Sequence, residues 1–330
     1  MPRILYIDLL KAFAIFCVIL GHTIAWTLAG DAYHESELFI FIYSFHMPLF
    51  VTLSGWFFGK SLGQTPLHFL KTRAQQLLLP VFNFFTLFFI IYNGVLTPIL
   101  GIEPAPYLQT ILGGDMWFLK YLFVMSLICY TLKKGLRRDW LVLVAILILF
   151  SVTRTGIFRL LPYLWLGYMM HQAQGKIQQY RGAILLISGL LFMLFAYLWQ
   201  GDYDAPLRFL YFKPTIFLHQ EHLYAVLVRL AVGTSGSIFF LTLFQHTEHY
   251  LQHHAWTKPL LHIGRNTLGI YCLQIYLIEY FCERALPLKL DGPLADLWRI
   301  LLALVGLAIC QGIALLLERN RWTSRLFLGR

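Results

Sequence analysis

Long apolar segments separated by short polar ones recur along all 330 residues of the chain. A helix needs about 20 apolar residues to cross a bilayer, whereas a strand of an outer-membrane barrel shows about ten residues of alternating character. The pattern therefore predicts an all-α fold, a polytopic membrane bundle of about ten transmembrane helices in a single domain over residues 1–330. The expected spans are 7–28, 38–59, 75–97, 116–132, 140–153, 158–172, 182–200, 223–244, 264–282 and 296–317.

The basic residues indicate how these spans are oriented. Only 13% of the residues are charged and 58% are hydrophobic, which excludes a soluble domain of this length. With a cytoplasmic N-terminus, sixteen Lys and Arg fall on the inner side and six on the outer side. The positive-inside rule then favours ten crossings with both termini in the cytoplasm. Because the net charge of +10 is dispersed between apolar segments, we expect contact with membrane lipids and not with nucleic acid.

The segment 7–28 is the most informative, because it carries Lys11 near its start and His22 well inside the apolar run. On a helix this spacing places both side chains within about 20° of one face, about 16 Å apart along the axis. Ionisable groups inside a membrane usually face a protein interior or a watery cavity and serve a function. The alternative is a lysine that reaches the membrane surface and a histidine bonded to a carbonyl. A cleaved signal peptide is less favoured, since Asp8 and Lys11 stand at the entrance.

The second and third spans offer further candidates. In the second span, His46 and Pro48 lie near the middle, and Ser54 precedes a glycine near the end. The proline frees a backbone carbonyl and the glycine allows a ligand or another helix to approach closely, although a kinked packing helix is the favoured explanation for these residues alone. Lys71 and Arg73 stand at the cytoplasmic start of the third span and could hold a phosphate group by charge-assisted hydrogen bonds. Ordinary positive-inside topology is the alternative for this pair.

Four residues of the later spans are candidates for the lining of a pocket. Trp117 opens the fourth span, where an aromatic belt is the simpler explanation. Asn266 and Tyr271 place hydrogen-bonding groups in the ninth span. Arg229, in the eighth span, needs a carboxylate partner within the membrane, and we consider Glu279 for that role.

A histidine-rich loop raises the question of a metal site. Helical spacing of three and four residues could join its imidazoles around an ion, but no cysteine or carboxylate converges on them. The five cysteines show no metal-ligand spacing. We therefore expect no metal and treat the loop as part of an interfacial helix. Its histidines are His246, His249, His253 and His254.

Five motifs in order resemble the membrane acyltransferase-3 family. They are IDLLKAFAIFCVILGH, FHMPLFVTLSGWFF, KTRAQQLLLP, MWFLKYLF and GRNTLGIYCLQ, and they extend over nearly the whole chain. The first contains a basic residue, ten intervening residues and a histidine, as in the family. The chain is similar to the short sugar O-acetyltransferases of the fucose 4-O-acetylase type, and the likeness implies a multi-pass protein of the bacterial inner membrane.

The resemblance implies an acetyl-CoA-dependent O-acyltransferase that moves an acetyl group to a hydroxyl of a cell-surface or lipid-linked carbohydrate. It assigns catalysis to His22 and Lys11, and acyl-CoA binding to Lys71 and Arg73. No cofactor is expected beyond acetyl-CoA as donor co-substrate. The chain departs from the family at two positions: the cation is often arginine where Lys11 stands, and histidine is frequent in place of Gln274, to which we assign no catalytic role.

Sugar hydroxyls are weak nucleophiles, so we expect His22 to act as a general base, with an acetyl-histidine intermediate as the alternative. Two interpretations from other classes stay open. The helix face that carries Lys11 and His22 could line the path of a polysaccharide or glycolipid transporter. Alternatively, the chain could be a non-catalytic subunit of a surface-glycan assembly. Transfer of label from acetyl-CoA to a glycan distinguishes the enzyme from both.

Overall fold

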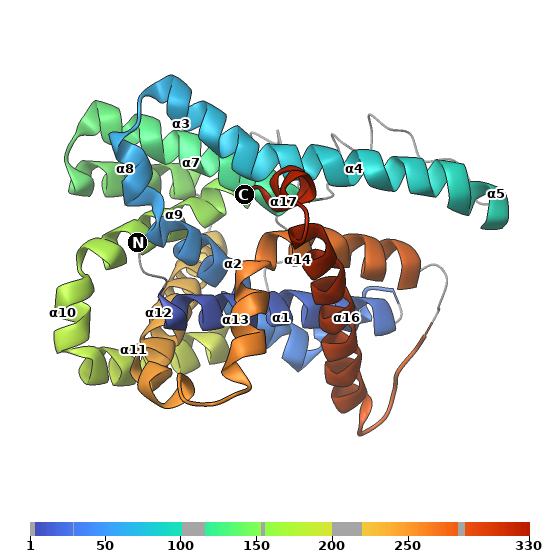
Figure 1. Ribbon diagram of the computed structural model, residues 1–330. Coiled ribbons are helices and arrows are strands. Elements are labelled where there is room, and N and C mark those ends of the chain that lie inside the picture. The colour runs from blue at the N-terminus through green and yellow to red at the C-terminus, as the bar shows by residue number, and fades with distance from the viewer. Residues whose placement is uncertain (1–3, 29, 101–115, 153–155, 200–219, 283–287) are drawn as a thin grey trace.

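The computed structural model describes residues 4–28, 30–100, 116–152, 156–199, 220–282 and 288–330, and every regular element within them is helical (Figure 1). The all-α prediction is confirmed for these residues. The α-helices are α1 (Leu5–Thr27), α2 (Glu37–Trp56), α3 (Pro66–Arg73), α4 (Leu79–Ile91), α5 (Thr97–Leu100), α7 (Trp117–Leu136), α8 (Asp139–Val152), α9 (Gly156–Gln172), α10 (Gln174–Gln179), α11 (Arg181–Leu198), α12 (Gln220–Leu251), α13 (Thr257–Arg265), α14 (Thr267–Gln274), α16 (Ala295–Glu318) and α17 (Arg321–Leu328).

Short helices of other types join several of these elements. Two 3-10 helices, η1 (Ala32–Glu35) and η2 (Phe58–Gly63), precede and follow α2. Three π-helical segments, η3 (Ala74–Leu78), η4 (Tyr92–Leu96) and η5 (Ile275–Cys282), interrupt or extend longer helices. Because π turns are rare and lie frequently at functional sites, η3 and η5 are candidates for segments that contribute to such a site.

α1 is the central helix of the bundle and contacts α2, α12, α13 and α16. In its most apolar stretch 72% of the residues are buried, against 11% for the peripheral α11. The buried hydroxyls of Thr23 and Thr27 each donate to the carbonyl four residues earlier at 2.8 Å, so they bring no unsatisfied polar group into the core. α1 therefore supplies the core against which the other elements pack.

α2 and α9 pack with their backbones in close approach. A Cβ added at Gly55 would collide with the Leu164 carbonyl, and one at Gly167 would collide with the Thr52 carbonyl. This is the small-residue contact that allows membrane helices to pack tightly. The glycine after Ser54 thus admits a neighbouring helix, which is one of the two roles considered for it from the sequence.

Three predicted spans differ from the observed helices. The expected span 223–244 lies within α12, which continues to Leu251. The expected span 75–97 belongs to one continuous helical rod that begins nine residues earlier, at Pro66 (Figure 1). The expected span 264–282 is divided, because α13 ends at Arg265 and α14 begins at Thr267. Asn266 is the junction, and its backbone lies outside the helical region.

Within the described residues, six helices have the length and composition to cross a membrane. They are Leu5–Thr27, Glu37–Trp56, Pro66–Ile99, Arg181–Leu198, Tyr224–Leu251 and Ala295–Glu318, with shorter apolar helices at Asp139–Ser151 and Thr267–Cys282. The chain is thus a multi-pass membrane protein. Ten crossings and two cytoplasmic termini stay predictions.

Candidate functional site

A cavity of about 300 Å³ lies among α1, α2, η3, α7 and α14. Most of its wall is apolar, with side chains such as Phe50, Phe118 and Leu122. A few polar groups therefore determine what the cavity can hold. The polar side chains that line it are Lys11, Ser54, Arg73, Gln76, Thr267 and Tyr271. Four of these six are site residues proposed from the sequence, brought together from four different elements.

The α1 stripe, the helix face that carries Lys11 and His22, connects this cavity to His22. Lys11 lines the cavity, as does Val18 two helical turns later, and His22 follows one further turn along the same face. His22 itself is not among the lining residues. The predicted common face of Lys11 and His22 is present, with the cavity extending along the helix to one turn short of the imidazole.

His22 is oriented by a carboxylate. Its Nδ1 lies 2.9 Å from Oε1 of Glu279, which η5 presents to α1. A carboxylate accepts the Nδ1 proton, so Nε2 carries the lone pair in the neutral imidazole. The two side chains are 26% and 35% exposed, which leaves Nε2 within reach of a substrate. This geometry corrects the pairing of Glu279 with Arg229 that we considered from the sequence.

Lys71 and Arg73 have different environments. Arg73 lines the cavity, donates from Nη2 to the Ser61 hydroxyl at 2.8 Å and lies over the Phe69 ring at 5.7 Å. No carboxylate lies within ion-pair distance of Arg73 in the described part of the chain. Lys71 is exposed and does not line the cavity. A half-buried guanidinium without a carboxylate has free capacity for an anion.

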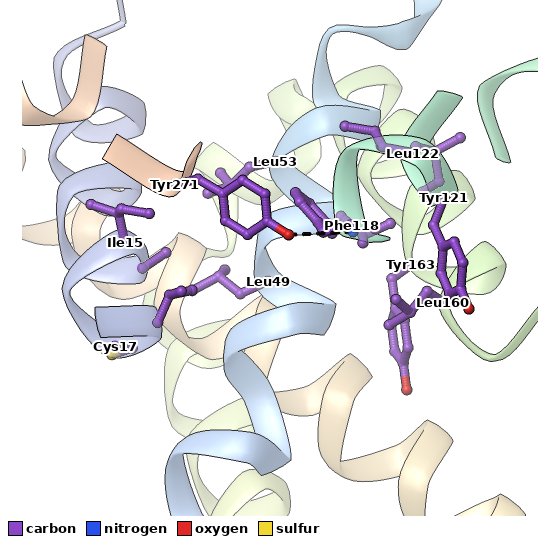
Figure 2. Packing of buried hydrophobic residues seen from close by; sticks show 14 of the residues in the cluster. Ile15, Cys17, Leu49, Leu53, Phe118, Tyr121, Leu122, Leu160, Tyr163 and Tyr271 are labelled. Atoms are coloured by element: carbon purple, nitrogen blue, oxygen red, sulfur yellow. Dashed lines mark hydrogen bonds between the residues drawn. The ribbon is translucent and has the colours of Figure 1, made fainter. Parts of the chain in front are cut away.

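Ser54, on α2, and Tyr271, on α14, both line the cavity. The Ser54 hydroxyl donates to the Phe50 carbonyl at 3.0 Å, which leaves its oxygen able to accept from a ligand. The Tyr271 hydroxyl accepts from the backbone N–H of Phe118 at 3.4 Å (Figure 2). Phe118 is in the first turn of α7, whose N–H groups have no helical partner, so Tyr271 ties α14 to the start of α7.

Two other sequence candidates lie outside the cavity lining. Trp117 packs edge-on against Tyr121, with ring centroids 5.2 Å apart. Arg229 lies over the Trp199 ring at 5.6 Å, and its backbone carbonyl accepts from the Tyr163 hydroxyl at 2.8 Å. Both side chains are thus held by aromatic neighbours of the bundle.

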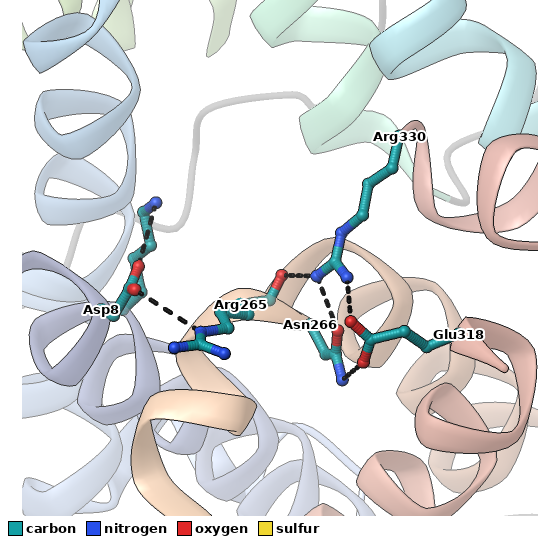
Figure 3. A network of polar contacts seen from close by, with 6 residues as sticks. Asp8, Arg265, Asn266, Glu318 and Arg330 are labelled. Atoms are coloured by element: carbon teal, nitrogen blue, oxygen red, sulfur yellow. Dashed lines mark hydrogen bonds and ion pairs between the residues drawn. The ribbon is translucent and has the colours of Figure 1, made fainter. Parts of the chain in front are cut away.

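Asn266 belongs to a polar network beside the cavity (Figure 3). Its side-chain nitrogen donates to Glu318 at 3.3 Å, and its oxygen accepts from Arg330 at 2.7 Å. The next residue, Thr267, lines the cavity, as does Gly329. Asn266 therefore acts on the cavity by fixing the junction of α13 and α14.

Sequence reasoning missed Gln76, Thr267 and Gly329 as parts of the wall, and it gave Glu279 the wrong partner. Glu279 did carry a signal, because it is a carboxylate inside a predicted span. Gln76 lies in the π turn η3, which no local sequence pattern announces. It lies three residues after Arg73, and both side chains line the cavity.

A search for groups of three or more His, Cys, Asp or Glu side chains able to hold a metal ion gives none among the described residues. In the histidine-rich segment the rings of His249 and His253 lie 5.6 Å apart, and His254 stacks on Trp256. The first contact brings together two imidazoles and the second joins an imidazole to an indole, so these contacts do not gather the three ligands that a metal site needs.

The chain matches a protein family and a curated relative. The family described as "Acyltransferase domain" matches residues 4–319. Nodulation protein NolL of Mesorhizobium japonicum (strain LMG 29417 / CECT 9101 / MAFF 303099) is 30% identical over 208 residues. That alignment covers 58% of this chain and 56% of the relative, so the chain spans little more than half of the relative's length. The family match covers both ends of the α1 stripe and the whole cavity wall except Gly329.

Proposed function

Because this chain belongs to the acyltransferase domain family over residues 4–319, we propose that it is a membrane O-acyltransferase that uses acetyl-CoA. The acceptor is a hydroxyl of a cell-surface or lipid-linked carbohydrate, and the location is the bacterial inner membrane. One observation carries the proposal: the His22–Glu279 pair, at 2.9 Å, lies one helical turn beyond a cavity that contains Lys11 and Arg73.

The end of the α1 stripe that carries His22 supplies the general base. Glu279 holds the Nδ1 proton of His22, and Nε2 takes the proton of the acceptor hydroxyl. The hydroxyl oxygen then forms a bond to the thioester carbonyl carbon, and the C–S bond breaks. The imidazolium returns its proton to the departing thiolate, so the histidine is regenerated. Glu279 stabilises the transient imidazolium by its negative charge.

The other end supplies donor binding. Arg73, with Ser61 as its hydrogen-bonding partner, takes a phosphate group of the donor, and Lys11 adds a second positive charge inside the cavity. The pantetheine arm then lies along the apolar wall toward His22, since this arm joins the phosphates of CoA to the thioester. Lys71 contributes to attraction of the donor from its exposed position.

An acetyl-histidine intermediate is the alternative route, with Nε2 of His22 as the nucleophile. Here the acetyl group forms a bond to Nε2 as the C–S bond breaks and the thiolate departs. In a second step the acceptor hydroxyl oxygen takes the acetyl group from Nε2, and the hydroxyl proton is released to balance the proton that the thiolate takes up. Incubation with labelled acetyl-CoA without an acceptor distinguishes the routes, because only the covalent route leaves label on a peptide that contains His22.

The test uses the purified chain in lipid nanodiscs with ¹⁴C-acetyl-CoA and a panel of lipid-linked and free oligosaccharides. Label recovered on an acceptor hydroxyl, located by mass spectrometry, supports the enzyme. Passage of an oligosaccharide across proteoliposomes without acetylation supports a transporter. Absence of both activities, together with free replacement of His22 in cells, supports a structural subunit.

A further inference from the structure

Two cations share one carboxylate beside the cavity. Nζ of Lys11 lies 3.9 Å from Oδ1 of Asp8, and Nε of Arg265 lies 4.0 Å from Oδ2 of the same side chain (Figure 3). Charge-assisted hydrogen bonds are about 2.7–2.9 Å long, so neither contact is one. Within the described ranges, Asp8 is the only carboxylate that reaches either cation. The buried Nε of Arg265 has no hydrogen-bond partner there.

The neighbouring arginine has its charge fully compensated. Arg330 forms an ion pair with Glu318 at 2.6 Å, donates to the Asn266 side chain at 2.7 Å and also donates to the Arg265 carbonyl. These contacts fix the backbone of Arg265, while the carboxylate nearest its side chain, among the residues that the structure describes, is the distant Asp8. Arg330 is therefore a positioning residue, and Arg265 is the one with remaining capacity for an anion.

The packing of α13 on α1 places Arg265 where it is. A Cβ at Gly264 would collide with the Asp8 carbonyl, so glycine is required for the two backbones to meet. That contact sets the next residue, Arg265, beside the Asp8 carboxylate. Thr267, two residues further on, already lines the cavity. Arg265 thus lies close to Lys11, beside the cavity and outside its lining.

The charges at this end do not balance. Lys11 and Arg265 share the Asp8 carboxylate, and Arg73 has only the neutral Ser61 hydroxyl, so among the described residues three positive charges stand against one negative charge. Desolvated cations without partners are unfavourable and mark a place for anionic groups. Lys11 and Arg73 line the cavity, whereas Arg265 lies outside its lining, so the positive charge extends beyond the cavity wall.

We propose that Arg265 binds a second anionic group of the donor, the phosphate on its ribose, while Arg73 and Lys11 take the diphosphate that leads to the pantetheine arm. This inference rests on the proposed function. It assigns the site to a thioester donor that carries phosphate at two separate positions. The ribose phosphate is the phosphate group farthest from the thioester, and Arg265 is the one of these three cations that lies outside the cavity lining.

The experiment compares acetyl-CoA with acetyl-3′-dephospho-CoA, measured as dissociation constants by calorimetry on the full chain in nanodiscs. The wild type is expected to bind acetyl-CoA about ten- to a hundredfold more tightly, the range of a charged hydrogen bond. Arg265→Gln should reduce this ratio to about one, because it removes affinity only for the donor that has the ribose phosphate. Lys258→Gln, an exposed residue of the same helix, should leave the ratio unchanged.

Equal binding of the two donors by the wild type overturns the inference, as does a ratio that survives in Arg265→Gln. If Arg265→Gln does not fold, Arg265→Lys serves as the second variant. Lysine keeps the positive charge but lacks the paired N–H donors of a guanidinium, so the ratio of the two dissociation constants should fall only in part. Loss of discrimination in Arg73→Gln together with an unchanged ratio in Arg265→Lys also contradicts the assignment. If the wild type transfers acetyl groups but binds acetyl-CoA and acetyl-3′-dephospho-CoA equally, only the assignment of Arg265 is refuted. If the wild type neither binds nor uses either donor, the proposed function is refuted.

Discussion

The two ends of the α1 stripe differ in how their ionisable groups are held. At one end the Lys11 ammonium has a carboxylate no closer than 3.9 Å, and at the other the His22 imidazole meets Glu279 at 2.9 Å. A close bond fixes the direction and tautomer of a ring, while a distant one leaves a charge available to a ligand. The same helix thus presents a binding group and an oriented base, about 16 Å apart along its axis.

The largest expected effect is at the oriented end. His22→Ala should reduce the rate of acetyl transfer by about 10²- to 10⁴-fold, the usual contribution of general acid–base catalysis. Affinity for acetyl-CoA should stay within about twofold, because the cavity lining ends at Val18, one turn before His22. Single-turnover transfer and donor binding are measured side by side. His68→Ala changes an exposed histidine and serves as the control; a His22→Ala rate near that of the wild type would remove the base from the proposed function.

A smaller effect is expected from the partner of the base. Glu279→Gln removes the negative charge at 2.9 Å from Nδ1 and should lower the transfer rate by about 10- to 100-fold, the range of a charged hydrogen bond. KM for acetyl-CoA should change little, since the carboxylate lies at the far end from the cations. Glu37→Gln alters an exposed carboxylate at the start of α2 and controls for general loss of charge. A fall in KM and rate together would indicate a different role for Glu279.

The smallest effect separates two residues of the binding end. Arg73→Gln should raise KM for acetyl-CoA by about tenfold, because a half-buried guanidinium on the cavity wall loses its contact with a phosphate. Lys71→Gln should raise it only about twofold, since an exposed charge is screened by water and salt. Initial rates over a range of donor concentrations give both values. Equal changes in KM for the two variants would show that lining the cavity gives Arg73 no larger part in donor binding than the exposed Lys71 has.

Much of the fold could be predicted from the chain alone, because apolar runs of membrane-spanning length report burial in lipid directly. The all-helical class and the central helix α1 were expected in this way, and α1 was displaced by only one or two residues at its ends. The Asn266 junction between α13 and α14 was not expected. It depends on Arg330 and Glu318, which lie more than fifty residues away in sequence and leave no local signal.

The site could be predicted only as a set of candidates. Lys11, Ser54, Arg73 and Tyr271 do meet at one cavity, while Trp117 and Arg229 are held elsewhere by aromatic rings. Sequence position gave Lys71 and Arg73 equal standing, but the helix carries one into the wall and leaves the other exposed. Two residues apart on α3, the two side chains point about 200° from each other, and only the packing of that helix decides which of them faces the cavity.

By itself the sequence determined that this chain enters a membrane and that Lys11 and His22 share a face of its first helix, because hydrophobicity and helical period are local properties. Only the tertiary structure decided that Glu279, and not a nearer residue, orients His22, and that Gly264 brings Arg265 to Asp8. Those contacts join residues from distant parts of the chain, so they exist only once the helices have packed.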